Sequence, residues 1–375
     1  MRKEVFFNNS SKKYRILIAP LDWGLGHATR CVPIIKELID LNCEVLIAAD
    51  KKIFLLLKKE FPNTVFLPCK GYKIRYSRSK KYFSLQLFFQ LPKIIFSIFR
   101  EKNWLSKMVK LHSIDAVISD NRFGMYHKKI PSIYITHQLS IKTGNKFSEI
   151  IAQKIHYYFI KKFSACWIPD KKINGLAGEL SHPQKIPQNV VYIGPLSRFK
   201  PIKNPEKVYD LLITISGPEP QRSIFEKIII QQLKDFAGKA LVIRGIPSEE
   251  NLYSSLNDSI TLVNHLPANE LNTIIEQSKI IISRSGYTTV MDLAALEKKA
   301  ILIPTLGQTE QEYLAKYLSE KKYFFTAQQK SFSLQEALEK YSSFPFQIPG
   351  LSNAEYKKTI YEFVLSLKSR NFANQ

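Results

Sequence analysis

The chain has 375 residues, of which 45% are hydrophobic, and it carries a formal net charge of +23. This length exceeds the usual size of one hydrophobic core, so two domains are expected. The longest apolar-looking stretch, 83–99, is interrupted by glutamine, proline and lysine and is too short to span a bilayer. No secretory leader is predicted at the start, because its apolar run is only three residues long. We therefore expect a cytoplasmic protein.

The four cysteines and the distribution of charge further limit the classes of protein to which the chain can belong. The cysteines show no C-x-x-C spacing, which argues against a disulfide framework and against a zinc site. Up to Ser197 there are 33 Lys and Arg against 13 Asp and Glu, whereas from Arg198 onward the counts are 22 and 19. The positive charge thus belongs to the first half, which either faces an anionic partner or repels itself.

Predicted strands alternate with predicted helices along the first half. Residues 14–20 form an apolar run typical of a buried parallel strand, and a glycine-containing turn follows it. Apolar residues recur at helical spacing over 28–41, and 44–49 is the next strand. Such alternation predicts a doubly wound parallel sheet. Later strands are expected at 64–67, 114–119, 132–136, 166–168 and 190–193.

The alternation lapses in a proline-containing segment, 194–207, which we interpret as a linker. It then restarts, with strands expected at 211–215, 240–243, 260–263, 280–283, 300–304 and 323–325. The fold class predicted is α/β, with two doubly wound, Rossmann-like domains facing a cleft. The predicted domains are 1–197, which binds the acceptor, 198–351, which binds a nucleotide sugar, and a helix within 352–375 that packs back toward the first domain.

Three loops of the second half follow predicted strands and have the composition of a phosphate and sugar site. The first contains Gly217, which lets a ligand approach the backbone, and Arg222, which neutralises phosphate. The second, 283–289, opens a helix whose free N–H groups suit a diphosphate. The third, 304–311, carries side chains that hydrogen-bond sugar hydroxyls. The structural alternatives are an ordinary turn for the first loop, N-capping by serine for the second and a solvated loop for the third.

The second loop, read on to residue 293 as Ser-Arg-Ser-Gly-Tyr-Thr-Thr-Val-Met-Asp-Leu, resembles the S-R-x-G-x-x-T-x-x-E-L signature of glycosyltransferase family 28. The best-known member of that family is the N-acetylglucosaminyltransferase of peptidoglycan lipid synthesis. The resemblance implies a GT-B fold, a UDP-sugar donor, inversion at the anomeric carbon, and a ribose held by Asp292 in place of glutamate. The loops and the resemblance together give these donor-binding candidates: Ser216, Gly217, Arg222, Arg244, His265, Leu266, Ser283, Arg284, Ser285, Gly286, Thr288, Thr289, Asp292, Gln308 and Gln311.

The third loop departs from the family pattern. The family's D-H-Q-x-x-N-A segment corresponds to residues 309–315, which keep Gln311 and Ala315 but lack the histidine and the asparagine. The transferred sugar therefore stays open between a hexose and an N-acetylhexosamine.

In the first half, residues 22–30 lie between the first strand and its helix and contain Gly24, Gly26 and His27. A G-x-G also opens dinucleotide sites, but Thr29 stands where that fingerprint has its third glycine. The run resembles the family's G-G-T-G-G-H loop, in which glycines admit the acceptor and the histidine lies near the reacting hydroxyl. We therefore expect Gly24 and Gly26 to bind the acceptor and His27 to be catalytic, with helix capping as the alternative.

Two further strand ends are expected to open into the same cleft. Asp120 is a second candidate catalytic residue, and Asn121 and His137 are candidates for acceptor binding. The alternative is that these side chains only satisfy backbone groups of their loops.

The stretch from Lys70 to Lys110 holds eleven Lys and Arg against one acid, Glu101, and interleaves them with aromatic residues. Basic and aromatic residues around an apolar helix suit an anionic membrane surface. Stacking on the bases of a nucleic acid is a rival interpretation, and a helix that simply packs on the sheet is a third.

Together these features predict a glycosyltransferase that passes a hexose or N-acetylhexosamine from a nucleotide sugar, UDP-linked, to a lipid-linked or other envelope acceptor. No cofactor and no metal ion are expected, since no D-x-D motif or ligand cluster is seen and arginines are available to neutralise the diphosphate. Peripheral attachment to the inner face of the membrane is expected, and nucleic acid is not. A UDP-sugar epimerase of the same fold is the alternative, and a basic nucleic-acid-binding protein is a weaker one.

Overall fold

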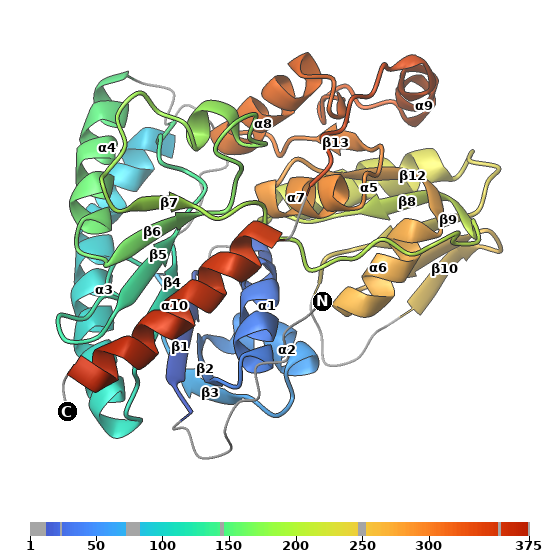
Figure 1. Cartoon of the computed structure of the whole chain (residues 1–375). Coiled ribbons are helices and arrows are strands. Elements are labelled where there is room, and N and C mark those ends of the chain that lie inside the picture. Colours follow the sequence, from blue (N-terminus) through green and yellow to red (C-terminus); the bar gives the residue numbers. More distant parts are fainter. Residues whose placement is uncertain are drawn as a thin grey trace.

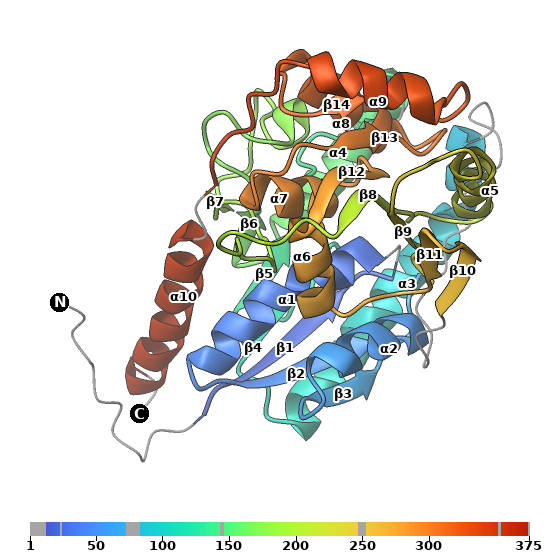
Figure 2. The same ribbon diagram turned by 90° about the vertical axis from the view of Figure 1, so that its right-hand side faces the viewer.

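The computed structural model describes residues 13–22, 25–72, 83–142, 146–246, 253–351 and 354–373. Two seven-stranded sheets, each flanked by helices, follow one another along the chain (Figure 1). Turning the molecule by 90° shows the helix α1 lying below the second sheet's α6 and α7 (Figure 2). This arrangement confirms the predicted α/β class with two doubly wound sheets.

All described strand pairs of the first sheet are parallel, in the order β3-β2-β1-β4-β5-β6-β7. Its central strands are buried on both faces, as their unbroken apolar runs require. The strands are β1 (Arg15–Pro20), β2 (Glu44–Ala49), β3 (Val65–Pro68), β4 (Ala116–Asp120), β5 (Ser132–Ile135), β6 (Ala165–Ile168) and β7 (Val190–Tyr192), and the helices are α1 (Leu25–Asp40), α2 (Lys51–Glu60), α3 (Phe83–Leu111) and α4 (Lys146–Ile160).

The second sheet has the order β10-β11-β9-β8-β12-β13-β14 and is parallel except at its β10 edge. Its strands are β8 (Tyr209–Thr214), β9 (Ala240–Ile243), β10 (Tyr253–Asn257), β11 (Ile260–Val263), β12 (Ser278–Arg284), β13 (Ile301–Ile303) and β14 (Phe325–Thr326). Its helices are α5 (Gln221–Leu233), α6 (Ala268–Glu276), α7 (Tyr287–Ala295), α8 (Thr309–Glu320) and α9 (Leu334–Ser343).

Each strand expected from the sequence is present, with bounds that agree or shift by at most two residues. The strand that sequence reasoning missed is β10, which pairs antiparallel with β11. Four of its five residues are exposed, so its sequence, Tyr-Ser-Ser-Leu-Asn, lacks the apolar run that marks the buried strands.

The last helix, α10 (Ala354–Ala373), crosses to the first sheet's side of the molecule (Figure 1). Lys357 Nζ lies 3.1 Å from Glu37 Oε2 of α1, and the Phe363 ring meets Trp167 of β6 edge-on at 5.5 Å. Burial of Ile360 and Val364 between these elements adds apolar contact. Residues 193–208 form no helix or strand between the two sheets. The domain bounds given above stay predictions.

Helix α3 is anchored to the first sheet by a buried ion pair. Glu101 Oε1 accepts from Arg122 Nε at 2.8 Å, and both side chains are at most 1% exposed. Glu101 Oε2 also accepts from Tyr72 Oη at 2.8 Å. A buried charge needs such partners. Within the described part of the chain, no helix is long and apolar enough to cross a bilayer.

Candidate active site

Helix α1 of the first sheet and helix α7 of the second meet at their N-terminal ends. Thr288, in the first turn of α7, donates a hydrogen bond from Oγ1 to the carbonyl of Gly26 in α1 at 3.1 Å. The neighbouring Tyr287 donates from its hydroxyl to the carbonyl of Pro169 at 2.9 Å. The glycine loop of the first half and the phosphate-type loop of the second half are therefore in direct contact.

On the first sheet's side of this contact, the two candidate catalytic residues are bonded to each other. His27 Nδ1 lies 2.8 Å from Asp120 Oδ1, where Asp120 is the last residue of β4. Arg30, one turn along α1, donates from Nε to Asp120 Oδ2 at 2.8 Å and from Nη2 to Oδ1. Burial alone would raise the pKa of Asp120, but Arg30 and His27 hold that pKa well below its usual range. Asp120 is therefore a carboxylate.

A second histidine joins this cluster to the other sheet. His137, just after β5, lies with Nδ1 2.8 Å from Arg30 Nη1 and with Nε2 2.7 Å from Glu310 Oε1 of α8. Its ring stacks on Tyr287 at 4.4 Å. Burial lowers the pKa of His137 despite the nearby Glu310. The pKa of Glu310 is itself lowered, because His137 more than offsets the effect of burial. A neutral imidazole and a carboxylate thus face each other across the cleft.

The second sheet contributes the open space at the contact. Gly286 precedes α7 with φ −71° and ψ 136°, and a Cβ placed there would meet nothing within 4 Å. Gly307, with φ +84°, faces open space in the same way. Gly217 has φ +112°, a conformation that L residues other than glycine rarely adopt. Gly286 and Gly307 thus border open space, and the space at Gly286 lies beside the N-terminus of α7.

The candidate phosphate-binding arginines differ in how far their charge is already compensated. Arg222 pairs with Glu219 and Glu226, and Arg244 pairs with Glu226 at 2.6 Å. Arg284 is fully buried, and the hydrogen-bond partners found for it in the described residues are carbonyl or amide oxygens. Burial lowers the pKa of Arg284 to about 9. Arg284 is thus the least compensated cation of the three.

Arg284 also shapes the loop after β8. Its Nη2 donates to the carbonyl of Gln221 at 3.1 Å, and its Nε lies 3.4 Å from the carbonyl of Ser216. The guanidinium also packs over the Phe225 ring, 4.1 Å from its centroid. Arg284 therefore holds the predicted diphosphate loop in place through contacts with its backbone carbonyls.

Asp292, the predicted ribose ligand, is 4% exposed and already has partners in the segment between the sheets. It accepts from Ser197 Oγ at 2.9 Å and lies 3.4 Å from Arg198 Nε. Burial raises the pKa of Asp292 despite Arg198. A ribose would have to share or displace these bonds.

Three of the other donor candidates brace the loops of the second half. Ser283 Oγ accepts from Thr214, and Ser285 Oγ donates to the carbonyl of Gln311. The Gln311 side chain accepts from the backbone N–H of Thr305 at 2.9 Å. Leu266 is buried, and burial with nearby Arg198 and Lys59 lowers the pKa of His265 to about 4. The remaining two, Thr289 and Gln308, are partly exposed.

On the acceptor side, Asn121 adopts φ +55° and accepts from the Tyr134 hydroxyl at 3.1 Å. Gly26 is exposed, and Gly24 lies outside the described residues. Beneath Asn121 and Tyr134, the buried ring of His156 packs on Phe123 and Tyr134.

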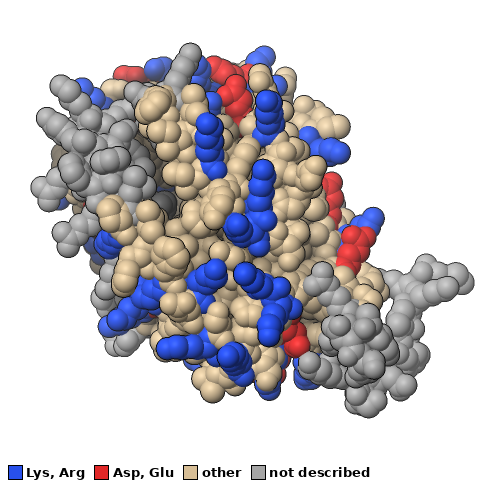
Figure 3. Space-filling model, turned by 90° about the vertical axis from the view of Figure 1, so that its left-hand side faces the viewer, with Lys and Arg blue, Asp and Glu red and all other residues tan. Residues whose placement is uncertain are grey.

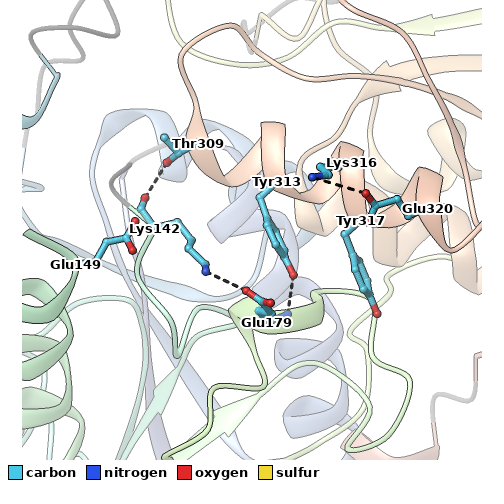
Figure 4. A pocket seen from close by; sticks show the side chains of 8 residues that line it. All are labelled: Lys142, Glu149, Glu179, Thr309, Tyr313, Lys316, Tyr317 and Glu320. Atoms are coloured by element: carbon cyan, nitrogen blue, oxygen red, sulfur yellow. Dashed lines mark hydrogen bonds and ion pairs between the residues drawn. The ribbon is translucent and has the colours of Figure 1, made fainter. Parts of the chain in front are cut away.

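A pocket of about 530 Å³ borders both halves next to Glu310. Figure 4 shows Tyr313 and Tyr317 projecting side by side from α8 toward the loop that carries Glu179. Thr309 Oγ1 donates to the carbonyl of Lys142 at 2.8 Å, which ties the start of α8 to the first half. The lining residues are Lys142, Glu149, Glu179, Thr309, Tyr313, Lys316, Tyr317 and Glu320.

Sequence reasoning assigned no role to Arg30 or Tyr287, and it expected Glu310 only to hydrogen-bond sugar hydroxyls. These three residues join the predicted ones into one cluster. Arg30 lies three positions after His27, so helical spacing placed it on the same face. Glu310 stands where the family has histidine. Among the described residues, no group of three or more His, Cys, Asp or Glu is arranged to hold a metal ion.

Comparison with known proteins relates the second half of the chain to a known family. Residues 241–361 match the family model of the glycosyltransferase family 28 C-terminal domain. An uncharacterized glycosyltransferase from Methanosarcina acetivorans is 22% identical over 337 residues, which cover 82% of this chain and 84% of that protein.

Two solved structures show the fold. The glycosyltransferase of kitacinnamycin has a TM-score of 0.61 at 13% identity and covers 95% of this chain and 96% of its own. MurG of Acinetobacter baumannii has a TM-score of 0.50 at 12% identity and covers 96% of this chain and 95% of its own. The likeness to these structures shows a GT-B fold, and residues 241–361 match the C-terminal domain of glycosyltransferase family 28.

The burial of His156 predicts a pH effect on stability. Burial lowers the pKa of His156 from 6.5 to about 4, so the unfolded chain binds this proton first as the pH falls. The free energy of unfolding should therefore fall between pH 6.5 and 4. His156→Phe should remove up to about 3 kcal/mol of that fall, since each pKa unit corresponds to about 1.4 kcal/mol. Urea unfolding at several pH values measures the free energy of unfolding of both proteins, and the difference between them should be constant above pH 7. If this free energy falls equally steeply with pH for both proteins below pH 6.5, the prediction is rejected.

Proposed function

We propose that the protein transfers a hexose or N-acetylhexosamine from a UDP-sugar. The premise is that residues 241–361 match a glycosyltransferase family 28 C-terminal domain, within a GT-B fold. The acceptor proposed is lipid-linked or another envelope component. The observation that carries the proposal is the open space at Gly286, at the start of α7 and within reach of the first half through Thr288.

The chemistry of the donor site follows from its charges. Backbone N–H groups at the start of α7 present partial positive charge to a diphosphate. Arg284, which lacks a carboxylate partner in the described structure, adds an uncompensated charge below the neighbouring loop. Both would stabilise the diphosphate as it leaves the sugar, which is when its negative charge grows. A metal ion is therefore not needed for this step in our proposal.

The first prediction concerns UDP. Gly286→Trp should abolish UDP binding, because the indole would fill the space that we assign to the diphosphate. Gly286→Ala is the matched control: its Cβ would meet nothing within 4 Å and the backbone angles suit any residue, so binding should be kept. Calorimetry with UDP and thymidine diphosphate on the full chain measures both. A folded Gly286→Trp protein that still binds UDP as tightly as Gly286→Ala would remove the donor site from this helix.

On the acceptor side, we propose that His27 is the general base. An alcohol is a poor nucleophile at neutral pH, and an imidazole held by a carboxylate is suited to take its proton. Asp120 accepts from the ring at Nδ1, and this leaves Nε2 for the acceptor hydroxyl. The reaction then runs by in-line attack with inversion at the anomeric carbon, which is part of our proposal.

Removing the base gives the second prediction. His27→Asn should lower turnover by about 10²–10⁴-fold, because general-base help is typically worth that much. UDP affinity should be nearly unchanged, since the donor is held by the other half. The asparagine keeps a polar group near Asp120 but cannot take a proton. Near-normal turnover of His27→Asn would reject His27 as the base and make Asp120 the next residue to test.

We further propose that the first half lies on an anionic membrane, where a lipid-linked acceptor is found. Exposed apolar side chains occur on two neighbouring helices, α3 and α4. The two helices contribute Ile94, Ile98 and Phe159 to the same hydrophobic cluster. The side of the molecule on which α3 and α4 lie shows many Lys and Arg and few acids (Figure 3). Exposed apolar residues with basic neighbours suit an anionic bilayer. They are Ile95, Phe96 and Phe99 on α3, and Phe147, Ile150, Ile151, Ile155 and Tyr158 on α4.

Vesicle binding gives the third prediction. The protein should sediment with vesicles that contain phosphatidylglycerol, less so as salt rises, and less with neutral phosphatidylcholine vesicles. Replacing both Phe96 and Phe99 by serine should weaken the binding, because both rings are more than half exposed. Replacing Tyr361 and Leu365 on α10, which are about 40% exposed, is the matched control and should leave it unchanged. Equal binding to both vesicle types, or stronger binding to single-stranded DNA, would contradict the membrane proposal.

A further inference from the structure

Arg30 is the residue through which the histidines on the two sides of the cleft are connected. Its side chain is 2% exposed, and three of its nitrogens are engaged. Nε and Nη2 donate to the two oxygens of Asp120, and Nη1 lies 2.8 Å from His137 Nδ1. Nη2 also lies 3.0 Å from His27 Nδ1. One guanidinium therefore contacts both histidines.

These contacts fix where each imidazole carries its proton. A guanidinium has only donors, so His137 must accept at Nδ1. In a neutral ring the proton is then on Nε2, which donates to Glu310 at 2.7 Å.

His27 is fixed in the opposite way. Its Nδ1 lies 2.8 Å from Asp120 Oδ1 and 3.0 Å from Nη2 of Arg30, so it has both an acceptor and a donor as neighbours. The carboxylate is the closer of the two, and a charge-assisted bond to it is strong, which favours a proton on Nδ1 that is donated to Asp120. No bond to Nε2 of His27 occurs among the described residues, and the side chain is 19% exposed. Nε2 is therefore the nitrogen that is free to take a proton.

We propose that Arg30 is a positioning residue, which holds His27 with Nε2 unprotonated and holds His137 with Nε2–H directed to Glu310. The role of the base rests on the proposed function, but the two tautomers do not. Glu310 lies in the first turn of α8, beside the donor candidates Gln308 and Gln311. Through His137 and Arg30, the loop at the donor end of the cleft is thereby connected to the base.

The charges around His27 set the expected response to substitution. Asp120 faces it from β4, Arg30 from its own helix, and His137 and Glu310 from β5 and α8. Cys31 lies 3.8 Å from Asp120, and the contact from α7 is the uncharged Thr288. Without Arg30, His137 loses the donor at its Nδ1 and His27 loses the guanidinium beside its Nδ1, whereas Asp120 keeps its contact with His27.

Nitrogen NMR of ¹⁵N-histidine-labelled protein tests this without any substrate, so its outcome does not depend on transfer activity. The chain has seven histidines, and His27→Gln and His137→Gln assign the two signals. In the unchanged protein, His27 should show the Nδ1–H tautomer and His137 the Nε2–H tautomer. The reverse tautomer at either ring would overturn the proposal, whatever the variants do.

The variants separate positioning from simple structural support. In Arg30→Gln, both rings lose their contact with the guanidinium, so the ring-nitrogen signals of His27 and His137 should move and Nδ1 of His137 should no longer be held as an acceptor. Arg30→Lys keeps a donor-only cation and should move these signals less. Glu310→Gln leaves Arg30 in place, so His137 should keep its tautomer. A folded Arg30→Gln protein in which both rings keep their tautomers and signals contradicts the proposal; if this variant does not fold, the tautomers of the unchanged protein decide.

Discussion

The arrangement of the cleft depends on one buried ion pair, between Arg30 and Asp120. Both side chains are almost completely buried, and each needs the other, because an unpaired charge in such a place typically costs several kcal/mol. Asp120 ends the central strand β4, and Arg30 lies in the helix that follows β1. The pair therefore fixes α1 relative to the carboxyl edge of the sheet. His27 and His137 take their places from it, and Glu310 from the second half completes the cluster.

Charge is distributed unequally between the two sides of the cleft. On the first side, every charged group of the cluster has a partner, and the result is a neutral histidine beside a carboxylate. On the second side, Arg222 and Arg244 are matched by Glu219 and Glu226, but Arg284 has no carboxylate partner in the described structure. A buried cation of this kind costs energy in the empty protein. An anionic ligand at the start of α7 would offset that cost.

Much of the fold could be predicted from the sequence, because the buried parallel strands are continuous apolar runs. The exposed strand β10 could not, since its side chains are mostly polar and face solvent. In the site, the donor loop was recognisable because its residues are consecutive. The cluster around Arg30 was not recognisable. Its members, Arg30, Asp120, His137 and Glu310, lie up to 280 positions apart in the sequence, and hydrophobic periodicity does not indicate contacts between such distant residues. The contacts of Asp292 with Ser197 and Arg198 were invisible for the same reason.

Glycosyl transfer is tested most directly by product analysis of the full chain with a panel of UDP-sugars, with and without a lipid extract from bacterial envelopes. Mass spectrometry identifies the nucleotide and the lipid products together. Transfer predicts that UDP appears in step with a lipid heavier by one hexose or N-acetylhexosamine residue, and only when the extract is present. Conversion of one UDP-sugar into its epimer without any acceptor, or no change in any of the nucleotides and lipids, would contradict glycosyl transfer from a UDP-sugar.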